Sequence, residues 1–171
     1  MRLSLVRIAG TIAVLAMFVA AQTRIHAQLG WGAPPPESTS SIPAAQLIQP
    51  DELNRLLHAT GVHATGAIKP LVLQVGSHML FAQAHITGSE YAGAGAQPEG
   101  LNQLRTRVAL LNRKTFIVLY CGCCPWNRCP NVAPAFKLLR DLGFTNVKVL
   151  YMANNLGSDW VDKGYPVERG R

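Results

Sequence analysis

The sequence predicts a single α/β domain with a mainly parallel central sheet and helices on both faces. Short apolar runs without alternation, at Leu71–Val75, Phe116–Tyr120 and Val147–Tyr151, are typical of strands covered on both faces. Helical patterns lie between these runs, which indicates right-handed crossovers between parallel strands. With 171 residues, of which 49% are apolar and 15% charged, the chain is long enough for one domain with a substantial core.

The N-terminus has the pattern of a secretory signal peptide. Arg2 and Arg7 precede an uncharged apolar run, Ile8–Ala21, which is shorter than the roughly 20 residues of a membrane-spanning helix. We therefore expect residues 1–27 to be a signal peptide, with an uncleaved membrane anchor as the alternative. The protein is then periplasmic or secreted, without a membrane partner after cleavage, and faces an oxidising compartment.

Residues 28–44 are predicted to be a flexible linker because Pro, Gly and Ser dominate its first part, and residues 45–171 are predicted to be the domain. The chain has 16 Lys and Arg against 9 Asp and Glu, but the charges are scattered and three of the arginines precede the domain. This distribution favours small anions as partners and argues against nucleic acid.

The helices are predicted from apolar spacing and terminal residues. The segments are the stretch that opens at Pro50, His78–Gln83, Leu101–Asn112 and the stretch from Asn131 to Gly143. Gly143 is suited to the left-handed residue that ends a helix. The Gly- and Ala-rich segment Ala92–Gly100 is expected to be a loop that offers no side chains to the core.

All the cysteines of the chain lie in one loop after the apolar run that ends at Tyr120. They are Cys121, Cys123, Cys124 and Cys129. The carboxyl ends of central parallel strands are where open α/β sheets bind ligands. A cysteine between a strand end and a helix N-terminus faces unpaired amides and the helix dipole, which lower its pKa. We therefore expect Cys121 to be a nucleophile.

Several segments agree in order and spacing with one known family. Ala84–Ser89 resembles that family's Gly-His-Ile-Pro-Gly-Ala motif, and Phe116–Cys121 resembles the strand that ends on its catalytic cysteine. Leu142–Val147 matches the run after the active-site helix, and Trp160 with Lys163–Glu168 matches the C-terminal end. Residues 42–170 thus resemble a rhodanese-like domain, in which His85 corresponds to a structural histidine.

The resemblance implies a thiosulfate sulfurtransferase-like activity. Cys121 is then expected to take sulfane sulfur from a thiosulfate-like anion as a persulfide and to pass it to a thiol or cyanide. The candidate substrate-binding residues are Gly122, Cys123, Cys124, Trp126 and Arg128, and the candidate resolving thiols are Cys124 and Cys129. A periplasmic redox protein is a further candidate partner. No cofactor and no metal belong to this interpretation.

The sequence also departs from the family pattern. Gln74, Gly76 and Leu80 stand where the family usually has Asp, Arg and Glu, and we expect these changes to remove polar contacts between the sheet and the active site. The usual active loop is a cysteine, four residues and an arginine, whereas Arg128 lies seven places after Cys121. A lengthened loop with several cysteines is compatible with a larger anion.

Two other classes of function remain open. Cys121 and Cys124 form a Cys-x-x-Cys pair, which is typical of thiol-disulfide redox proteins. The cysteines are also numerous enough to bind Zn or Cu(I), although tetrahedral sites usually draw on two separated pairs of ligands. A non-catalytic metal-handling or binding domain is therefore the third interpretation.

Overall fold

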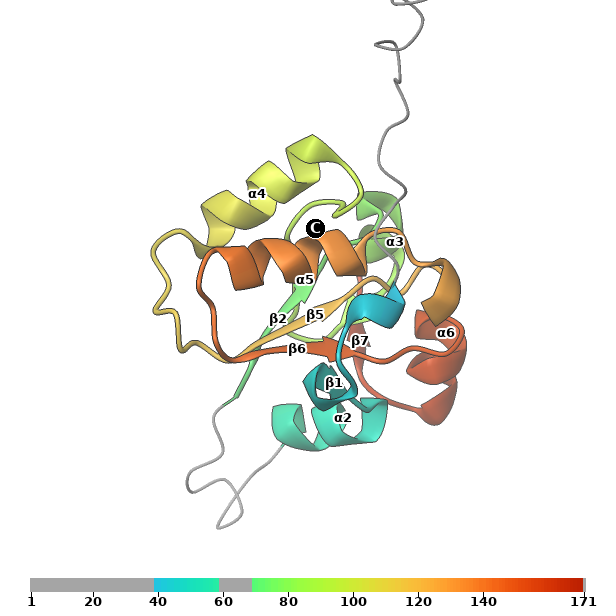
Figure 1. Cartoon of the computed structure of the whole chain (residues 1–171). Helices are drawn as coiled ribbons and strands as arrows, with labels where there is room; N and C mark the ends of the chain where they lie inside the picture. Colours follow the sequence, from blue (N-terminus) through green and yellow to red (C-terminus); the bar gives the residue numbers. More distant parts are fainter. Residues whose placement is uncertain (1–38, 59–68, 171) are drawn as a thin grey trace, which may run out of the picture. The chain divides into compact units, whose positions relative to one another are not determined.

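A parallel sheet forms the centre of the protein, in a computed structural model that describes residues 39–58 and 69–170. Its five strands have the order β1-β6-β5-β2-β4, and Figure 1 shows β1, β6, β5 and β2 side by side. The strands are β1 (Leu47–Ile48), β2 (Leu71–Gln74), β4 (Glu90–Tyr91), β5 (Ile117–Tyr120) and β6 (Val147–Leu150). The predicted α/β class with a mainly parallel sheet is confirmed.

Strand β5 lies in the middle of the sheet, and its side chains alternate between two cores. Ile117 and Leu119 belong to one core, whereas Val118 and Tyr120 belong to the other, and each of these residues is buried. A strand that is covered on both faces has no solvent side, which explains the unbroken apolar run in its sequence.

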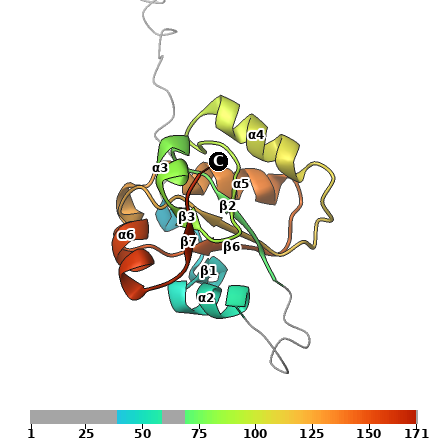
Figure 2. The ribbon, with the colours of Figure 1, turned by 180° about the vertical axis from the view of Figure 1, so that it is seen from behind.

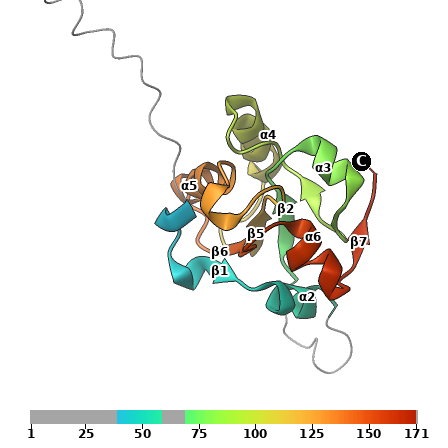
Figure 3. The same ribbon diagram turned by 90° about the vertical axis from the view of Figure 1, so that its right-hand side faces the viewer.

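Helices cover both faces of the sheet. The helices are α2 (Pro50–His58), α3 (His78–Gln83), α4 (Pro98–Val108), α5 (Val132–Asp141) and α6 (Leu156–Asp159), with the short 3-10 turns η1 (Thr39–Ser41), η2 (Ala44–Gln46), η4 (Trp126–Arg128) and η5 (Val161–Lys163). Figures 1 and 3 show α4 and α5 together on one side of the sheet, and α2 on the other. Leu104 and Leu139 of the first pair, and Leu53 of α2, are fully buried in these two cores.

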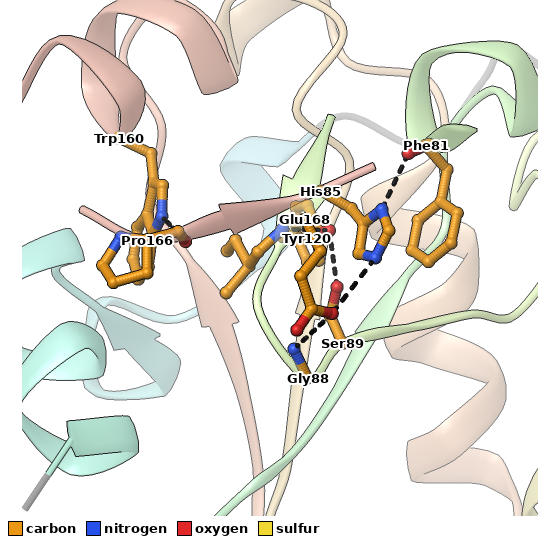
Figure 4. A network of polar contacts seen from close by, with 9 residues as sticks. Phe81, His85, Gly88, Ser89, Tyr120, Trp160, Pro166 and Glu168 are labelled. Carbon is orange, nitrogen blue, oxygen red and sulfur yellow. Dashed lines mark hydrogen bonds and ion pairs between the residues drawn. The ribbon is translucent and has the colours of Figure 1, made fainter. Parts of the chain in front are cut away.

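A small antiparallel sheet, β3 (His85–Ile86) with β7 (Val167–Glu168), joins the C-terminal segment to the domain (Figure 2). His85 is buried, its ring stacks on Phe81 with 3.8 Å between the ring centroids, and its Nδ1 hydrogen-bonds the Phe81 carbonyl oxygen at 2.8 Å. Its Nε2 lies 3.7 Å from Oε2 of Glu168 (Figure 4). His85 thus has the packing role expected of it.

Tyr120 links the central sheet to this small sheet. Its hydroxyl oxygen accepts a hydrogen bond from the Ile86 amide at 3.2 Å and lies 2.9 Å from Oγ of Ser89 (Figure 4). Burial raises the pKa of Tyr120 to about 12, so the hydroxyl stays protonated at neutral pH. These contacts therefore hold the end of β5 in place at Tyr120, the residue before Cys121.

Some elements differ from the predicted ones. Helix α4 begins at Pro98, within the segment that was predicted as loop, because proline suits the first turn of a helix. The strands β1, β3, β4 and β7 were not predicted, since each has only 2 residues and so carries no detectable periodicity.

The end of the predicted linker packs on the domain. Thr39 is buried and its Oγ1 donates to the carbonyl oxygen of Trp126 at 2.6 Å, and Ile42 belongs to the core. The predicted signal peptide, residues 1–27, and the linker up to residue 38 lie outside the described residues. Over residues 39–58 and 69–170, no helix combines the length and apolar character needed to cross a membrane.

Tyr120→Phe should destabilise the domain. The change leaves the buried Ile86 amide without its acceptor, and we expect the free energy of unfolding in urea to fall by about 1–3 kcal/mol. Tyr91→Phe is the matched control, because its hydroxyl makes no hydrogen bond with the described residues. Equal stabilities of the two variants would contradict the assigned role of Tyr120.

Candidate active site

The chain leaves β5 at Cys121 and turns sharply at Gly122. Gly122 has a φ of +75°, in the left-handed region that glycine adopts without strain. Beyond this turn Cys123 lies beside Cys121, with 2.9 Å between the two Sγ atoms. The Gly122 carbonyl oxygen accepts a hydrogen bond from the Leu156 amide at 3.0 Å, which ties the loop to the start of α6.

Four free thiols gather in this loop, and we refer to them as the thiol cluster: Cys121, Cys123, Cys124 and Cys129. The Sγ atoms of Cys123 and Cys124 are 3.1 Å apart, and those of Cys121, Cys123 and Cys124 all lie within 4.8 Å of one another. Cys121 and Cys129 are buried, whereas Cys123 and Cys124 are half-buried. Reagents in solution therefore have better access to Cys123 and Cys124.

The end of strand β2 supports the loop. Nε2 of Gln74 donates to the Cys121 carbonyl oxygen at 3.0 Å, and Oε1 of Gln74 accepts from the Gly76 amide at 3.1 Å. A Cβ atom at Gly76 would lie 2.9 Å from the Sγ of Cys121 and 2.8 Å from its carbonyl oxygen. The expected loss of polar contacts at these positions is therefore wrong for Gln74, whose amide supplies one, and Gly76 leaves the space that Cys121 occupies.

The Gly-rich segment before α4 also packs against the site. Nδ2 of Asn131 lies 3.4 Å from the Sγ of Cys121, and Oδ1 of Asn131 accepts from the Ala96 amide at 3.0 Å. A Cβ atom at Gly95 would lie 2.1 Å from the Asn131 carbonyl oxygen. Ala92 is buried in the core, so the expectation that this segment contributes no core side chain is wrong. The small residues allow a close approach to the start of α5.

A cavity of about 280 Å³ opens in front of Cys121 and Cys123. It is bounded by the end of β2, by α3 and by the start of α6, and its polar side chains are the amides of Gln74, Gln83 and Asn155. Among the described residues, no Lys, Arg, His, Asp or Glu side chain lines it. A small anion could receive hydrogen bonds from these amides, but it would have no cationic side chain beside it.

A second void of about 10 Å³ lies behind the loop and holds a single water at most. Cys124, Trp126 and Cys129 line this void, and Cys121 lines both spaces. Of the predicted substrate-binding residues, Gly122 and Cys123 thus line the larger cavity.

The other three predicted substrate residues lie elsewhere. Cys124 and Trp126 border the void, and the Trp126 ring packs on Tyr151 with 5.2 Å between the ring centroids. Arg128 is exposed and lines neither space. Only part of the predicted substrate set therefore lines the larger cavity, although the Sγ of Cys124 lies within 4.8 Å of that of Cys121.

Hydrogen bonds between the thiols determine which sulfur atoms of the cluster carry negative charge. The hydrogen bonds of Cys121 to Cys123 and Cys129, together with burial, raise the pKa of Cys121 above its ordinary value. The hydrogen bond from Cys121 lowers the pKa of Cys123 to about 6. Burial raises the pKa of Cys124. These directions favour a thiolate at Cys123 near neutral pH, while Cys121 and Cys124 hold their protons.

The helix N-terminus that we expected beside Cys121 lies beside Cys129 instead. The hydrogen bond from Cys121 lowers the pKa of Cys129 to about 7, and the backbone amides of Asn131 and Val132 lower it further. These amides belong to the first turn of α5, where unpaired donors and the helix dipole favour a thiolate. The expected lowering of the Cys121 pKa is therefore wrong, because these donors face another sulfur.

The same thiols could hold a soft metal ion. Cys121, Cys123 and Cys124 form the group of potential ligands, and no described His or carboxylate joins them. Sulfur-only sets of this kind suit Zn or Cu(I).

Comparison with known proteins gives matches only at the level of structure. Neither a protein-family model nor a curated protein sequence matches the chain. The rhodanese-like domain of the Alr3790 protein from Anabaena is 20% identical, and the match covers 72% of this chain and 79% of that one, with a TM-score of 0.51. A crystal structure of the same protein gives 20% identity and a TM-score of 0.52, over 72% and 92% of the two chains. The protein has the rhodanese-like fold.

A further solved structure agrees with this assignment. The BH2092 protein from Bacillus halodurans is 19% identical, and the match covers 72% of this chain and 76% of that one, with a TM-score of 0.53. The likeness establishes the rhodanese-like fold that the motifs predict. In this rhodanese-like domain the thiol cluster follows the central strand β5.

Gly76→Ala should displace Cys121. The added methyl group would overlap the Cys121 Sγ, and we expect the free energy of unfolding to fall by about 1–3 kcal/mol, together with altered alkylation of the loop thiols. Gly143→Ala is the control. An alanine at its φ of +84° should lower the free energy of unfolding by about 1–2 kcal/mol, and no atom lies within 4 Å of the new Cβ. An unchanged alkylation pattern in Gly76→Ala would contradict the packing argument.

Iodoacetamide should modify Cys123 first near neutral pH. Cys123 is half-buried and has a pKa of about 6, so its thiolate is present and accessible. Below that pKa protonation removes the thiolate, and the rate should fall about tenfold for each pH unit. Peptide mass spectrometry of briefly treated protein locates the label. Initial labelling of Cys121 would show that the charge is divided differently.

Proposed function

We propose that the protein is an exported sulfurtransferase that moves sulfane sulfur from a thiosulfate-like donor to a thiol or cyanide through a persulfide on Cys121. The observation that carries the proposal is the position of Cys121. It directly follows the central strand β5 of a rhodanese-like fold, and it lines the cavity of about 280 Å³. Parallel α/β sheets bind their ligands at this end of the strands.

The first chemical step needs a Cys121 thiolate. Cys123 is the nearest base, since its Sγ lies 2.9 Å from that of Cys121, and it takes the Cys121 proton as the donor is attacked. A thiolate of higher pKa is the stronger nucleophile once it has formed. The attack is assigned to Cys121 because of its position, directly after β5 and at the wall of the cavity. Cys121 Sγ bonds to the outer sulfur of thiosulfate, the sulfur–sulfur bond of the donor breaks, and sulfite leaves with the electron pair.

The second step returns Cys121 to its starting state. An acceptor thiolate or cyanide in the cavity attacks the outer persulfide sulfur, the bonding pair returns to the Cys121 Sγ, and the proton held by Cys123 goes back to Cys121. Asn131 Nδ2, at 3.4 Å, and the neighbouring thiols can donate hydrogen bonds to this sulfur as negative charge develops on it.

The donor would be held by neutral groups. Gln74, Gln83 and Asn155 supply amide groups at the cavity wall, and Gly122 lets the loop backbone lie close to a bound molecule. This set favours a small sulfur-containing anion of modest charge density. The signal-like sequence of residues 1–27 supports a periplasmic or secreted location.

A second candidate function is the binding of a thiophilic metal. It is favoured by the Sγ atoms of Cys121, Cys123 and Cys124, which lie within 4.8 Å of one another. In the sulfur-transfer interpretation these thiols work without a metal, so copurification of stoichiometric Zn or copper with a protein that turns over no sulfur donor would favour this alternative.

Mass spectrometry of the reduced full-length chain after incubation with thiosulfate tests the proposal. We expect one added sulfur atom on the peptide of Cys121, release of sulfite, and loss of both in Cys121→Ser. Absence of added sulfur and of sulfite in the parent protein would overturn sulfur transfer. Arg128→Ala, which alters an exposed loop residue outside the cavity, is expected to keep the reaction.

A further inference from the structure

The contact between Cys121 and Cys123 is close to that of a disulfide. Their Sγ atoms are 2.9 Å apart, against about 2.05 Å in a formed bond, and only Gly122 separates the two residues. The left-handed φ of Gly122 holds the two side chains next to each other. Both cysteines also line the cavity in which the donor would react.

We propose that Cys123 resolves the Cys121 persulfide internally, releasing the transferred sulfur as hydrosulfide and leaving a Cys121–Cys123 disulfide. This inference rests on the proposed function, because it needs the persulfide that sulfur transfer would form. It adds a second outcome to the reaction: thiosulfate is reduced by the protein's own thiols, without an acceptor molecule in the cavity.

The step balances without an external oxidant. The Cys123 sulfur attacks the Sγ of Cys121, the bond between that Sγ and the outer sulfur breaks, and the outer sulfur leaves with the electron pair. The proton that Cys123 received from Cys121 goes to the departing sulfur, which becomes hydrosulfide. The two cysteine sulfurs are oxidised to a disulfide, and their two electrons reduce the sulfane sulfur.

The neighbouring thiols are less suited to this role. Cys124 contacts Cys123 at 3.1 Å, and both Cys124 and Cys129 border the void behind the loop rather than the cavity. Cys129 is buried, whereas Cys123 is half-buried and more easily reached by the reductant that must reopen the disulfide. The sequence pointed to Cys124 and Cys129 as resolving thiols, and the geometry points to Cys123.

Repeated turnover by this route consumes a reductant. Each cycle oxidises a pair of thiols, so a thiol of another molecule must attack the disulfide and leave the protein reduced. The partner class is therefore a small dithiol or a reducing thiol-disulfide protein. In its absence the reaction stops after one hydrosulfide for each protein molecule.

A single-turnover experiment tests the inference. The reduced full-length chain, freed of reductant under nitrogen, is mixed with thiosulfate, and sulfite, hydrosulfide and the cysteine peptides are measured together. The parent protein should release equal amounts of sulfite and hydrosulfide and form the Cys121–Cys123 disulfide. Cys123→Ser lacks the base that activates Cys121, so its sulfite release should be slower, but for each sulfite released it should give at least about tenfold less hydrosulfide and accumulate the persulfide. Its circular dichroism spectrum shows whether it is folded. Cys124→Ser is compared to establish which thiol is required.

The outcomes separate the inference from the proposed function. Sulfite release with a stable persulfide and no hydrosulfide in the parent protein overturns the inference alone. So does sulfane sulfur found on Cys123, which would mean attack on the outer sulfur, or loss of hydrosulfide in Cys124→Ser with retention in Cys123→Ser. Absence of both sulfite and persulfide in the parent overturns the proposed function and, with it, the inference.

Discussion

The proton shared between Cys121 and Cys123 is the constraint on which the chemistry of this site depends. A buried thiolate is costly, because few groups replace the water that would solvate its charge. Cys121 is buried just after β5, so its thiol stays protonated. This thiol donates a hydrogen bond to the sulfur of the more exposed Cys123, 2.9 Å away. The sulfur that lies deepest is thus protonated at rest, and the sulfur beside it holds the base that can activate it.

Small residues and amide side chains make this arrangement possible. Gly76 and Gly95 leave room where a Cβ atom would overlap Cys121 or Asn131. Gln74 fixes the Cys121 carbonyl oxygen, and Asn131 joins the Gly-rich segment to the Cys121 sulfur. Neutral hydrogen-bonding groups therefore hold the site in place. The loop backbone, and not a charged side chain, sets the position of the Cys121 sulfur.

The sequence was sufficient for the fold because the buried strands and the longer helices have strong local patterns. Ile117–Tyr120 is apolar throughout, and α3 has the predicted bounds, His78–Gln83. The arrangement within the site could not be predicted in the same way. Which sulfur faces the α5 amides depends on how the loop folds, and Cys129 has this position although Cys121 follows the strand. The spacing of Arg128 likewise gave no sign that its side chain lies outside the cavity.

The division of charge among the thiols also bears on how the loop could persist if the protein is exported, as proposed, to an oxidising compartment. Oxidants and disulfides react with thiolates, so a protonated, buried Cys121 is protected while the half-buried Cys123 reacts first. A disulfide formed between them holds both sulfurs in a state that a thiol reductant can reverse, since neither has passed to the sulfinic level. The pairing proposed to end a reaction cycle would then also protect the proposed nucleophile, because both would use the 2.9 Å contact between Cys121 and Cys123.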